Sequence, residues 1–224
     1  MGTFTILLGG ELIRTPRLER QIAGSRVIAA DAGIGHARML GLVPELWVGD
    51  FDSVPANLPE DLASVPRKIF PAEKDMTDGE LAIAEALQRG ATSLVLAAEG
   101  AGKHEAGGAF GGKRADHASL HLALAVRLAE AGTTVLLTSG AQEGVPILPG
   151  KASFDYADST LFSVLGFSDL FGLTVTGAKW SLDRVEVTFG SSLTISNEVK
   201  GQLGIALERG RALLLAHPYP LPES

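Results

Sequence analysis

Two aspartates separated by one residue, Asp50 and Asp52, have a spacing that could support metal or phosphate chemistry. They follow the short apolar run Leu46–Gly49, which is typical of a buried strand. In extended backbone, residues i and i+2 point to the same side, so both carboxylates can lie together at the end of that strand. Two such charges repel unless a proton, a basic side chain or a hard cation lies between them, and Mg²⁺ carrying phosphates would meet this need. The alternative is a solvated aspartate-rich turn, because the pattern is short.

A second acidic strand end precedes this pair. Asp31 directly follows the apolar run Arg26–Ala30, and Gly33 and Gly35 come next. Glycines between a strand and a helix let backbone amides approach a ligand. The spacing of a dinucleotide-binding fingerprint is incomplete, however, and a plain strand-to-helix turn explains the glycines alone better. Asp31 is therefore the more informative residue.

The segment from Lys74 to Glu80 combines charge with a helix start. Thr77 and Glu80 predict a capping box, and Asp78 in the first turn complements the helix dipole. Capping alone accounts for Asp78 and Glu80, whereas Asp75 precedes the helix and has no such role. Lys74 could contact a phosphate or only a neighbouring carboxylate.

A glycine-rich segment, residues 99–113, leads to another charged helix start. The segment does not fit the pattern of a phosphate-binding P-loop and predicts a lid or a plain insertion. Arg114, Asp116 and His117 then begin a helix expected to run to about Glu130. Basic side chains beside an aspartate and a histidine could bind phosphate and metal, or could form only a charged first turn.

The elements that must position these residues change character along the chain. Up to about residue 140, strand-like and helix-like segments alternate, which predicts an α/β domain (1–140) with a Rossmann-like parallel sheet flanked by helices. Residues 139–151 carry three glycines and two prolines and suggest a linker. Beyond it, we expect an all-β sandwich domain (141–224). Its strand-like runs are 161–167, 172–179, 184–188, 193–196, 204–208 and 212–216.

Composition restricts the class of protein. The 224 residues carry 26 acidic and 19 basic side chains, a net charge of −7, which argues against nucleic-acid binding. The absence of cysteine excludes disulfides, thiolate chemistry and cysteine-based zinc sites. No apolar run approaches the roughly 18 residues of a membrane span, and the amino terminus has no basic segment of a signal peptide. We therefore expect a cytoplasmic protein without a membrane partner.

Several segments occur in the order found in one enzyme family. They are Ala30-Asp31 with Gly33 and His36; Gly49-Asp50-Phe51-Asp52-Ser53; Lys74-Asp75-Met76-Thr77-Asp78; Gly111-Gly112 with Arg114 and Asp116-His117; and, later, Gly172-Leu173-Thr174, Lys179-Trp180, Gly190-Ser191-Ser192 and Ser196-Asn197-Glu198. By these segments the chain resembles the thiamine pyrophosphokinases over nearly its whole length. It departs from the family pattern at Ala32, Ile34, Gly35 and His121, and its segment 99–113 is longer than usual.

The resemblance implies Mg²⁺-dependent transfer of pyrophosphate from ATP to the hydroxyl of thiamine, giving AMP and thiamine diphosphate, by a homodimer with the acceptor site between subunits. It assigns Asp50, Asp52 and Asp75 to Mg²⁺, with Asp78 and Asp116 as further catalytic residues. It assigns Asp31, Gly33, Lys74, Thr77, Arg114 and His117 to ATP, and Trp180, Ser196 and Asn197 to thiamine. Trp180 could instead be a core residue, and Ser196 with Asn197 a simple turn.

Three other functions are compatible with parts of the pattern. A phosphatase of the haloacid-dehalogenase type would use Asp50 as its nucleophile, but this does not account for the C-terminal β domain. A non-catalytic nucleotide or thiamine sensor could share the fold. A related pyrophosphokinase could act on another small alcohol. Turnover with different alcohols distinguishes these functions.

Overall fold

The computed structural model describes residues 2–51, 60–71, 75–97 and 115–219. The chain forms two compact units: unit 1 comprises residues 1–118 and 132–140, and unit 2 comprises residues 119–131 and 141–224. Within the described ranges, no helix has the length and apolar character needed to cross a membrane.

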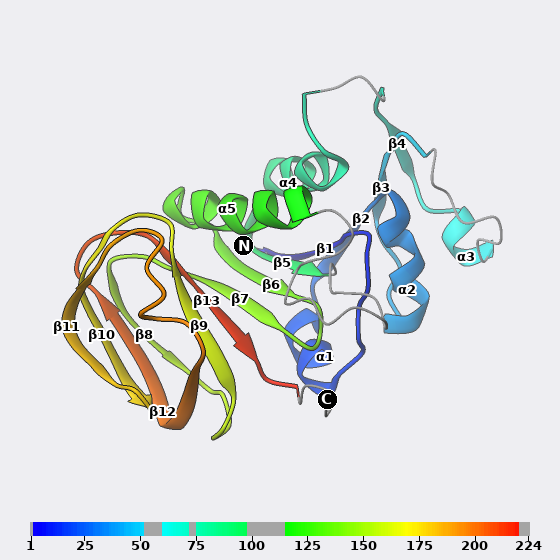
Figure 1. The fold of residues 1–224 in the computed structure, drawn as a ribbon. Helices are drawn as coiled ribbons and strands as arrows, with labels where there is room; N and C mark the ends of the chain where they lie inside the picture. Colours follow the sequence, from blue (N-terminus) through cyan, green and yellow to red (C-terminus); the bar gives the residue numbers. More distant parts are fainter. Residues whose placement is uncertain (1, 52–59, 72–74, 98–114, 220–224) are drawn as a thin grey trace. The chain divides into compact units, whose positions relative to one another are not determined.

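Unit 1 is built on a parallel sheet with the strand order β6-β5-β1-β2-β3-β4. Its strands are β1 (Gly2–Leu7), β2 (Arg26–Ala30), β3 (Leu46–Gly49), β4 (Arg67–Ile69), β5 (Ala91–Ala97) and β6 (Thr134–Thr138). Its helical elements are α1 (Pro16–Ile22), the 3₁₀ helix η1 (Asp31–Ile34), α2 (Gly35–Leu40), α3 (Glu60–Ala63) and α4 (Asp78–Gln88). In Figure 1, α4 lies on one face of this sheet and α1 and α2 on the other.

The inner strands of this sheet are almost wholly apolar because helices cover both faces. In β1, Phe4, Ile6 and Leu7 are all fully buried, and all four residues of β3 are buried. The edge strand β4 is exposed along its length, as expected for a strand with one neighbour. The continuous apolar runs in the sequence therefore identified the central strands correctly.

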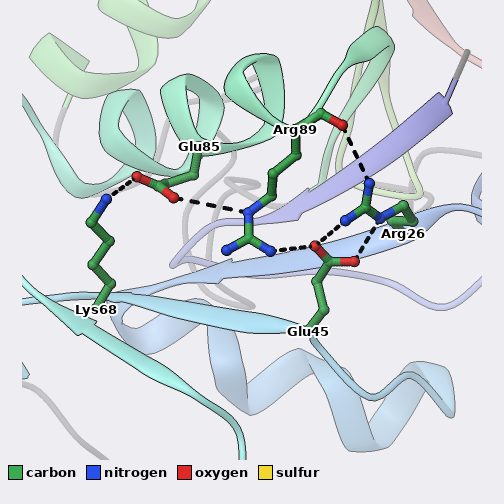
Figure 2. A network of polar contacts seen from close by, with 5 residues as sticks. All are labelled: Arg26, Glu45, Lys68, Glu85 and Arg89. Carbon is green, nitrogen blue, oxygen red and sulfur yellow. Dashed lines mark hydrogen bonds and ion pairs between the residues drawn. The ribbon is translucent and has the colours of Figure 1, made fainter.

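Charged side chains connect the carboxyl end of α4 to β2, to β4 and to the residue that precedes β3 (Figure 2). Arg26 donates two hydrogen bonds of 2.7 Å to the two carboxylate oxygens of Glu45. Arg89 donates to the same carboxylate at 2.7 Å, and its Nε lies 3.9 Å from the buried carboxylate of Glu85. Lys68 also donates to Glu85. Glu45 and Glu85 are each contacted by basic side chains, as expected because burying an unpaired charge is costly.

Unit 2 contains antiparallel strands arranged around one core. These strands are β7 (Glu143–Ile147), β8 (Gly150–Phe154), β9 (Leu161–Gly166), β10 (Leu170–Ala178), β11 (Leu182–Val187), β12 (Asn197–Leu207) and β13 (Ala212–His217). One set pairs as β7-β13-β9 and the other as β8-β12-β10-β11. The long strand β12 joins both sets, because its first two residues pair with β9. Helix α5 (Ala115–Glu130) belongs to this unit from Ser119 onward.

Two local predictions were wrong. Residues 139–151 are not a linker, because they contain β7 and the start of β8. Pairing of β7 with β13 outweighs the unfavourable glycine and proline content, since strand formation depends strongly on tertiary context. Residues 193–196 are not a strand but a turn, which is held to β9 by reciprocal hydrogen bonds between Thr194 and Val164.

Candidate active site

Asp31 and Asp50 lie at the carboxyl ends of two adjacent strands. The register of β2 and β3 pairs Ala30 with Val48, so Asp31 and Asp50 follow neighbouring strand ends. A Cβ atom placed on Gly49 would lie only 3.3 Å from the Cα of Asp31, which shows how closely the two backbones approach. The carboxyl edge of a parallel sheet is where ligands bind in such folds. The structure therefore brings together two of the acidic residues predicted from the sequence.

Backbone geometry at this edge differs from the simple expectation. Asp31 and Phe51 have positive φ angles of 43° and 63°, in the left-handed region that non-glycine residues rarely adopt. Phe51 is therefore not in the extended backbone that the predicted alignment of Asp50 with Asp52 assumed; Asp52 itself lies outside the described residues, so the alignment of the two carboxylates stays a prediction. Each such residue costs on the order of 1–3 kcal/mol and persists only where its surroundings hold it.

Trp47 contacts both of these strained positions. Its side chain is 0% exposed, and its indole Nε1 donates a 2.8 Å hydrogen bond to the backbone oxygen of Asp31. Its ring meets the ring of Phe51 edge to face, with centroids 4.7 Å apart and planes at 88°. The guanidinium carbon of Arg67 lies 4.7 Å from the Trp47 ring centroid and 5.5 Å from that of Phe51. One buried indole thus connects the ends of β2 and β3.

The amino terminus of α4 supplies the next group of predicted residues. The Thr77 hydroxyl accepts from the backbone N–H of Glu80 at 3.2 Å, and the Glu80 carboxylate accepts from the Thr77 N–H at 3.1 Å. The capping box is therefore confirmed, and it occupies the Thr77 side chain. Asp78 is the first residue of α4 and is half-buried, whereas Asp75 is exposed in the bend before it.

Gly33 has a structural reason to be glycine. It is buried in η1, and a Cβ there would lie 2.1 Å from the backbone oxygen of Leu7. Any side chain would push η1 away from the end of β1. His36, in α2, is half-buried; burial lowers its pKa, and a hydrogen bond with the backbone of Gly10 partly opposes that shift. Gly33 and His36 therefore both contact the backbone at or just after the end of β1. Contact of Gly33 with ATP stays a prediction.

Some predicted site residues cannot be placed. Asp52, Lys74 and Arg114 lie outside the described residues. Asp116 is exposed in the first turn of α5, and only the backbone of His117 is described, in the same turn. Within the described ranges, no group of three or more His, Cys, Asp or Glu residues could hold a metal ion. Protein-bound Mg²⁺ commonly uses only one or two carboxylates together with substrate phosphates, so this finding is compatible with the predicted site.

In unit 2, Trp180 and Asn197 are joined through the main chain. The Asn197 side-chain oxygen accepts from the Trp180 N–H at 3.1 Å, and its amide nitrogen donates to the Trp180 backbone oxygen at 2.8 Å. Asn197 is only 7% exposed, whereas Trp180 is 56% exposed. Trp180 is therefore not a core tryptophan, and the buried amide fixes the backbone that carries its indole.

Two neighbours define the surroundings of Trp180. The ammonium of Lys179 lies 4.9 Å from the Trp180 ring centroid and 3.1 Å from a carboxylate oxygen of Glu198. Ser196 is exposed with a φ of 58°, and its N–H donates to the hydroxyl of Ser163 at 3.0 Å. Ser196 thus lies in the turn before β12, as the alternative turn interpretation expected, whereas Asn197 is not part of a turn because it begins β12.

Trp47 and Arg67 were not singled out as functional residues from the sequence. The available signal was a tryptophan inside an apolar strand that ends in an acidic motif, because a buried indole N–H needs a hydrogen-bond acceptor. The acceptor, the backbone oxygen of Asp31, is 16 residues away in the chain, and only the parallel pairing of β2 with β3 brings it close.

Comparison with known proteins is consistent with this arrangement. Residues 22–137 match the model of the thiamin pyrophosphokinase catalytic domain, and residues 156–211 match that of the thiamin pyrophosphokinase vitamin B1 binding domain. Thiamine pyrophosphokinase of Bacillus subtilis is 28% identical over 206 residues, covering 89% of this chain and 90% of the relative.

Solved structures agree on the fold. A crystal structure of thiamine pyrophosphokinase from Bacillus subtilis superposes with a TM-score of 0.78 at 23% identity, covering 98% of this chain and all of that one. A thiamin pyrophosphokinase family protein from Enterococcus faecalis gives a TM-score of 0.75 at 21% identity, covering 97% and 99% of the two chains.

Proposed function

The chain belongs to the thiamin pyrophosphokinase family and is an ATP-dependent enzyme that transfers pyrophosphate to thiamine; we propose that it does so with Mg²⁺ and releases AMP and thiamine diphosphate. The observation that carries the proposal is the pair of acidic strand ends, Asp31 and Asp50, held side by side in unit 1. Because the chain belongs to this family, we no longer favour the alternative function, a phosphatase of the haloacid-dehalogenase type.

The donor set fits a magnesium ion. Carboxylate oxygens at the carboxyl edge of a parallel sheet are the hard ligands that Mg²⁺ prefers, and Asp50, Asp52 and Asp75 are the residues we assign to it. Bound there, the ion would neutralise charge on the β- and γ-phosphates of ATP. Asp31 contributes a further negative charge to this edge, and its backbone lies close to Gly49, where a Cβ would come within 3.3 Å of the Asp31 Cα.

The remaining residues of unit 1 are assigned to binding and orientation. Lys74, Arg114 and His117 supply positive or hydrogen-bonding groups for the phosphates of ATP, and Gly33 and Thr77 shape the backbone near them. Asp78 and Asp116 orient the reacting groups, and one carboxylate of the acidic set accepts the proton of the attacking hydroxyl. Positioning and charge neutralisation account for most of catalysis in phosphoryl transfer.

Unit 2 supplies the acceptor site in this proposal. The exposed indole of Trp180 offers a flat face to the aminopyrimidine or the cationic thiazolium of thiamine. Ser196 supplies a hydroxyl contact, and Asn197 acts by fixing the Trp180 backbone. We infer that the unit is a β-sandwich, because one hydrophobic core draws side chains from both sets of strands.

We propose that the enzyme is a homodimer with the acceptor site between subunits. Unit 2 exposes several large apolar side chains, which an interface with a second copy would bury. They are Leu161, Trp180, Phe189, Leu193 and Ile195. A second copy of the chain is the occupant that a symmetric interface requires. Sedimentation showing only monomer at micromolar concentration, with full activity, would contradict the dimer. The cytoplasmic location stays a prediction.

The test is AMP release from ATP and Mg²⁺ by the full chain, with thiamine compared against a panel of other small alcohols. We expect turnover with thiamine and its loss when the metal is chelated. Asp50→Asn should lower kcat by roughly 10²–10³-fold, the size seen when one group that stabilises transition-state charge is removed. Asp183→Asn, which removes an exposed carboxylate of β11 without a proposed role, is the matched control. Near wild-type turnover of Asp50→Asn at low Mg²⁺ would overturn the assignment.

A further inference from the structure

The turn that follows β3 folds back onto β3 itself. Phe51 places its ring edge to face against Trp47, two residues before the end of the strand, with centroids 4.7 Å apart. Asp50 lies between Phe51 and Gly49, the last residue of β3. The direction of the Asp50 side chain therefore depends on how firmly Phe51 is held against Trp47.

The same indole also fixes the neighbouring strand end. Its N–H donates to the backbone oxygen of Asp31 at 2.8 Å, and Asp31 is the first residue of η1. Both Asp31 and Phe51 have positive φ angles, and such strained backbone persists only where surrounding contacts hold it. Trp47 thus contacts two strained residues with different parts of its side chain. Its N–H bonds to Asp31, which carries a carboxylate, and its ring packs on Phe51, which follows Asp50.

Arg67 completes the cluster from the edge strand. The register of β3 and β4 pairs it with Trp47, and its guanidinium lies near both aromatic rings. A cation over an aromatic face is attracted by the ring quadrupole, so the guanidinium favours the arrangement in which the two rings meet. Arg67 is itself exposed, so its replacement should not create a buried cavity.

We propose that Trp47 and Arg67 are positioning residues for the acidic edge, holding Asp31 and Asp50 in one arrangement toward Mg²⁺-bound ATP. The inference rests on the proposed role of Asp50. A positioning role for Trp47 can be distinguished from a purely structural one. If Trp47 positions the acidic residues, loss of its indole N–H should weaken Mg²⁺-dependent ATP binding and turnover more than an equally buried substitution elsewhere in the sheet does.

The test compares Trp47→Phe, which keeps a ring but loses the N–H, with Phe4→Leu. Phe4 is equally buried in β1 and also lies under a guanidinium, that of Arg26 at 4.4 Å, but at the amino-terminal end of the sheet. We expect Trp47→Phe to lower kcat about 10–100-fold, the size seen for groups that orient metal ligands. The Mg²⁺ concentration for half-maximal activity should rise, and the thiamine KM should stay unchanged.

Binding is measured separately by calorimetry of ATP with Mg²⁺ in the absence of thiamine. Both variants are measured at a temperature below their thermal unfolding midpoints, and each ATP affinity in Mg²⁺ is compared with that of the wild type. The loss of affinity should be larger for Trp47→Phe than for Phe4→Leu. If Trp47→Phe and Phe4→Leu show the same Mg²⁺ dependence and ATP affinity, Trp47 is only structural and the inference is wrong.

Arg67→Met decides the question if Trp47→Phe does not fold. It removes the guanidinium from an exposed strand and should shift the Mg²⁺ requirement in the same direction by a smaller factor; an unchanged requirement overturns the inference. Asp50→Asn separates the two proposals. If that variant stays active, the proposed metal site is wrong; if it is inactive while Trp47→Phe and Arg67→Met behave like wild type, only the positioning role is wrong.

Discussion

The two tryptophans of this chain, one in each unit, are held in opposite ways. Trp47 is fully buried, and its own indole N–H and ring make the contacts that fix the ends of β2 and β3. Trp180 is more than half exposed, and the contacts that fix it are made to its backbone by the buried amide of Asn197.

The difference shows how one residue type serves two purposes. Where the side chain itself is held, the indole acts as part of the scaffold and positions groups elsewhere. Where hydrogen bonds hold the main chain and the ring meets the ammonium of a mostly exposed lysine, as at Trp180, the ring stays available to a ligand. The mode of restraint, rather than residue type, thus separates a positioning tryptophan from a proposed binding tryptophan.

The largest expected difference between the two regions is in stability. Trp47→Ala should lower the free energy of unfolding by about 3–5 kcal/mol, because it leaves a cavity and removes the hydrogen bond from the indole to the backbone oxygen of Asp31. Trp180→Ala removes a mostly exposed ring and should cost less than about 1 kcal/mol. Urea denaturation of both variants measures the contrast, and equal losses would contradict it.

The support under Trp180 gives the next largest effect. Asn197→Ala leaves the backbone N–H and oxygen of Trp180 without their partners and should cost about 1–3 kcal/mol. Asn197→Asp keeps the accepting oxygen but replaces the donor with a buried carboxylate oxygen facing the Trp180 carbonyl, so its cost should be at least as large. Both should raise the thiamine KM; a destabilised Asn197→Ala with an unchanged thiamine KM would separate Asn197 from the acceptor site.

Trp180→Ala tests ligand binding directly. Loss of an exposed stacking face worth about 1–2 kcal/mol should raise the thiamine KM roughly tenfold and leave the ATP KM unchanged. Trp180→Phe keeps an aromatic face, so its thiamine KM should lie between those of the wild type and Trp180→Ala. Neither variant should abolish the proposed dimer. Unchanged KM values for both substrates would show that the acceptor binds elsewhere.

The smallest expected effect is the response to acid of two half-buried histidines, His36 in unit 1 and His217 in unit 2. Burial lowers the pKa of His36 and of His217 from the ordinary 6.5. The folded state therefore favours neutral imidazole, so this contribution to stability is complete above pH 6.5 and is lost as pH falls from there through the folded pKa.

Unfolding midpoints in urea between pH 8 and pH 5 measure this response. His36→Gln and His217→Gln should each flatten the decline by a small amount. Glu45 acts at lower pH: burial would raise its pKa, but hydrogen bonds from Arg26 and Arg89 lower it overall from 4.5, so its contribution disappears only below that value. A decline below pH 6.5 that neither histidine variant changes would exclude both residues as its source.

Much of the fold could be predicted because local signals were strong. The apolar runs identified β2, β3 and β13 almost to the residue, and the Thr77–Glu80 capping box located α4. Predictions failed where pairing between distant residues decided the outcome. β7 contains a glycine and a proline, yet it pairs with β13 along its whole length, and β12 continues through Gly201 because neighbouring strands pair with it on either side of that residue.

The sequence by itself determined the chemistry of the site: which carboxylates are present, that Asp31 and Asp50 follow strands, and that an ordered series of motifs matches one family. Only the tertiary structure decided how those groups are held. The hydrogen bond from Trp47 to Asp31 joins residues 16 positions apart, and the hydrogen bonds between Asn197 and the Trp180 backbone join residues 17 positions apart. A sequence carries no local signal for such contacts, because they depend on the register of strands and on backbone angles that the surrounding packing imposes.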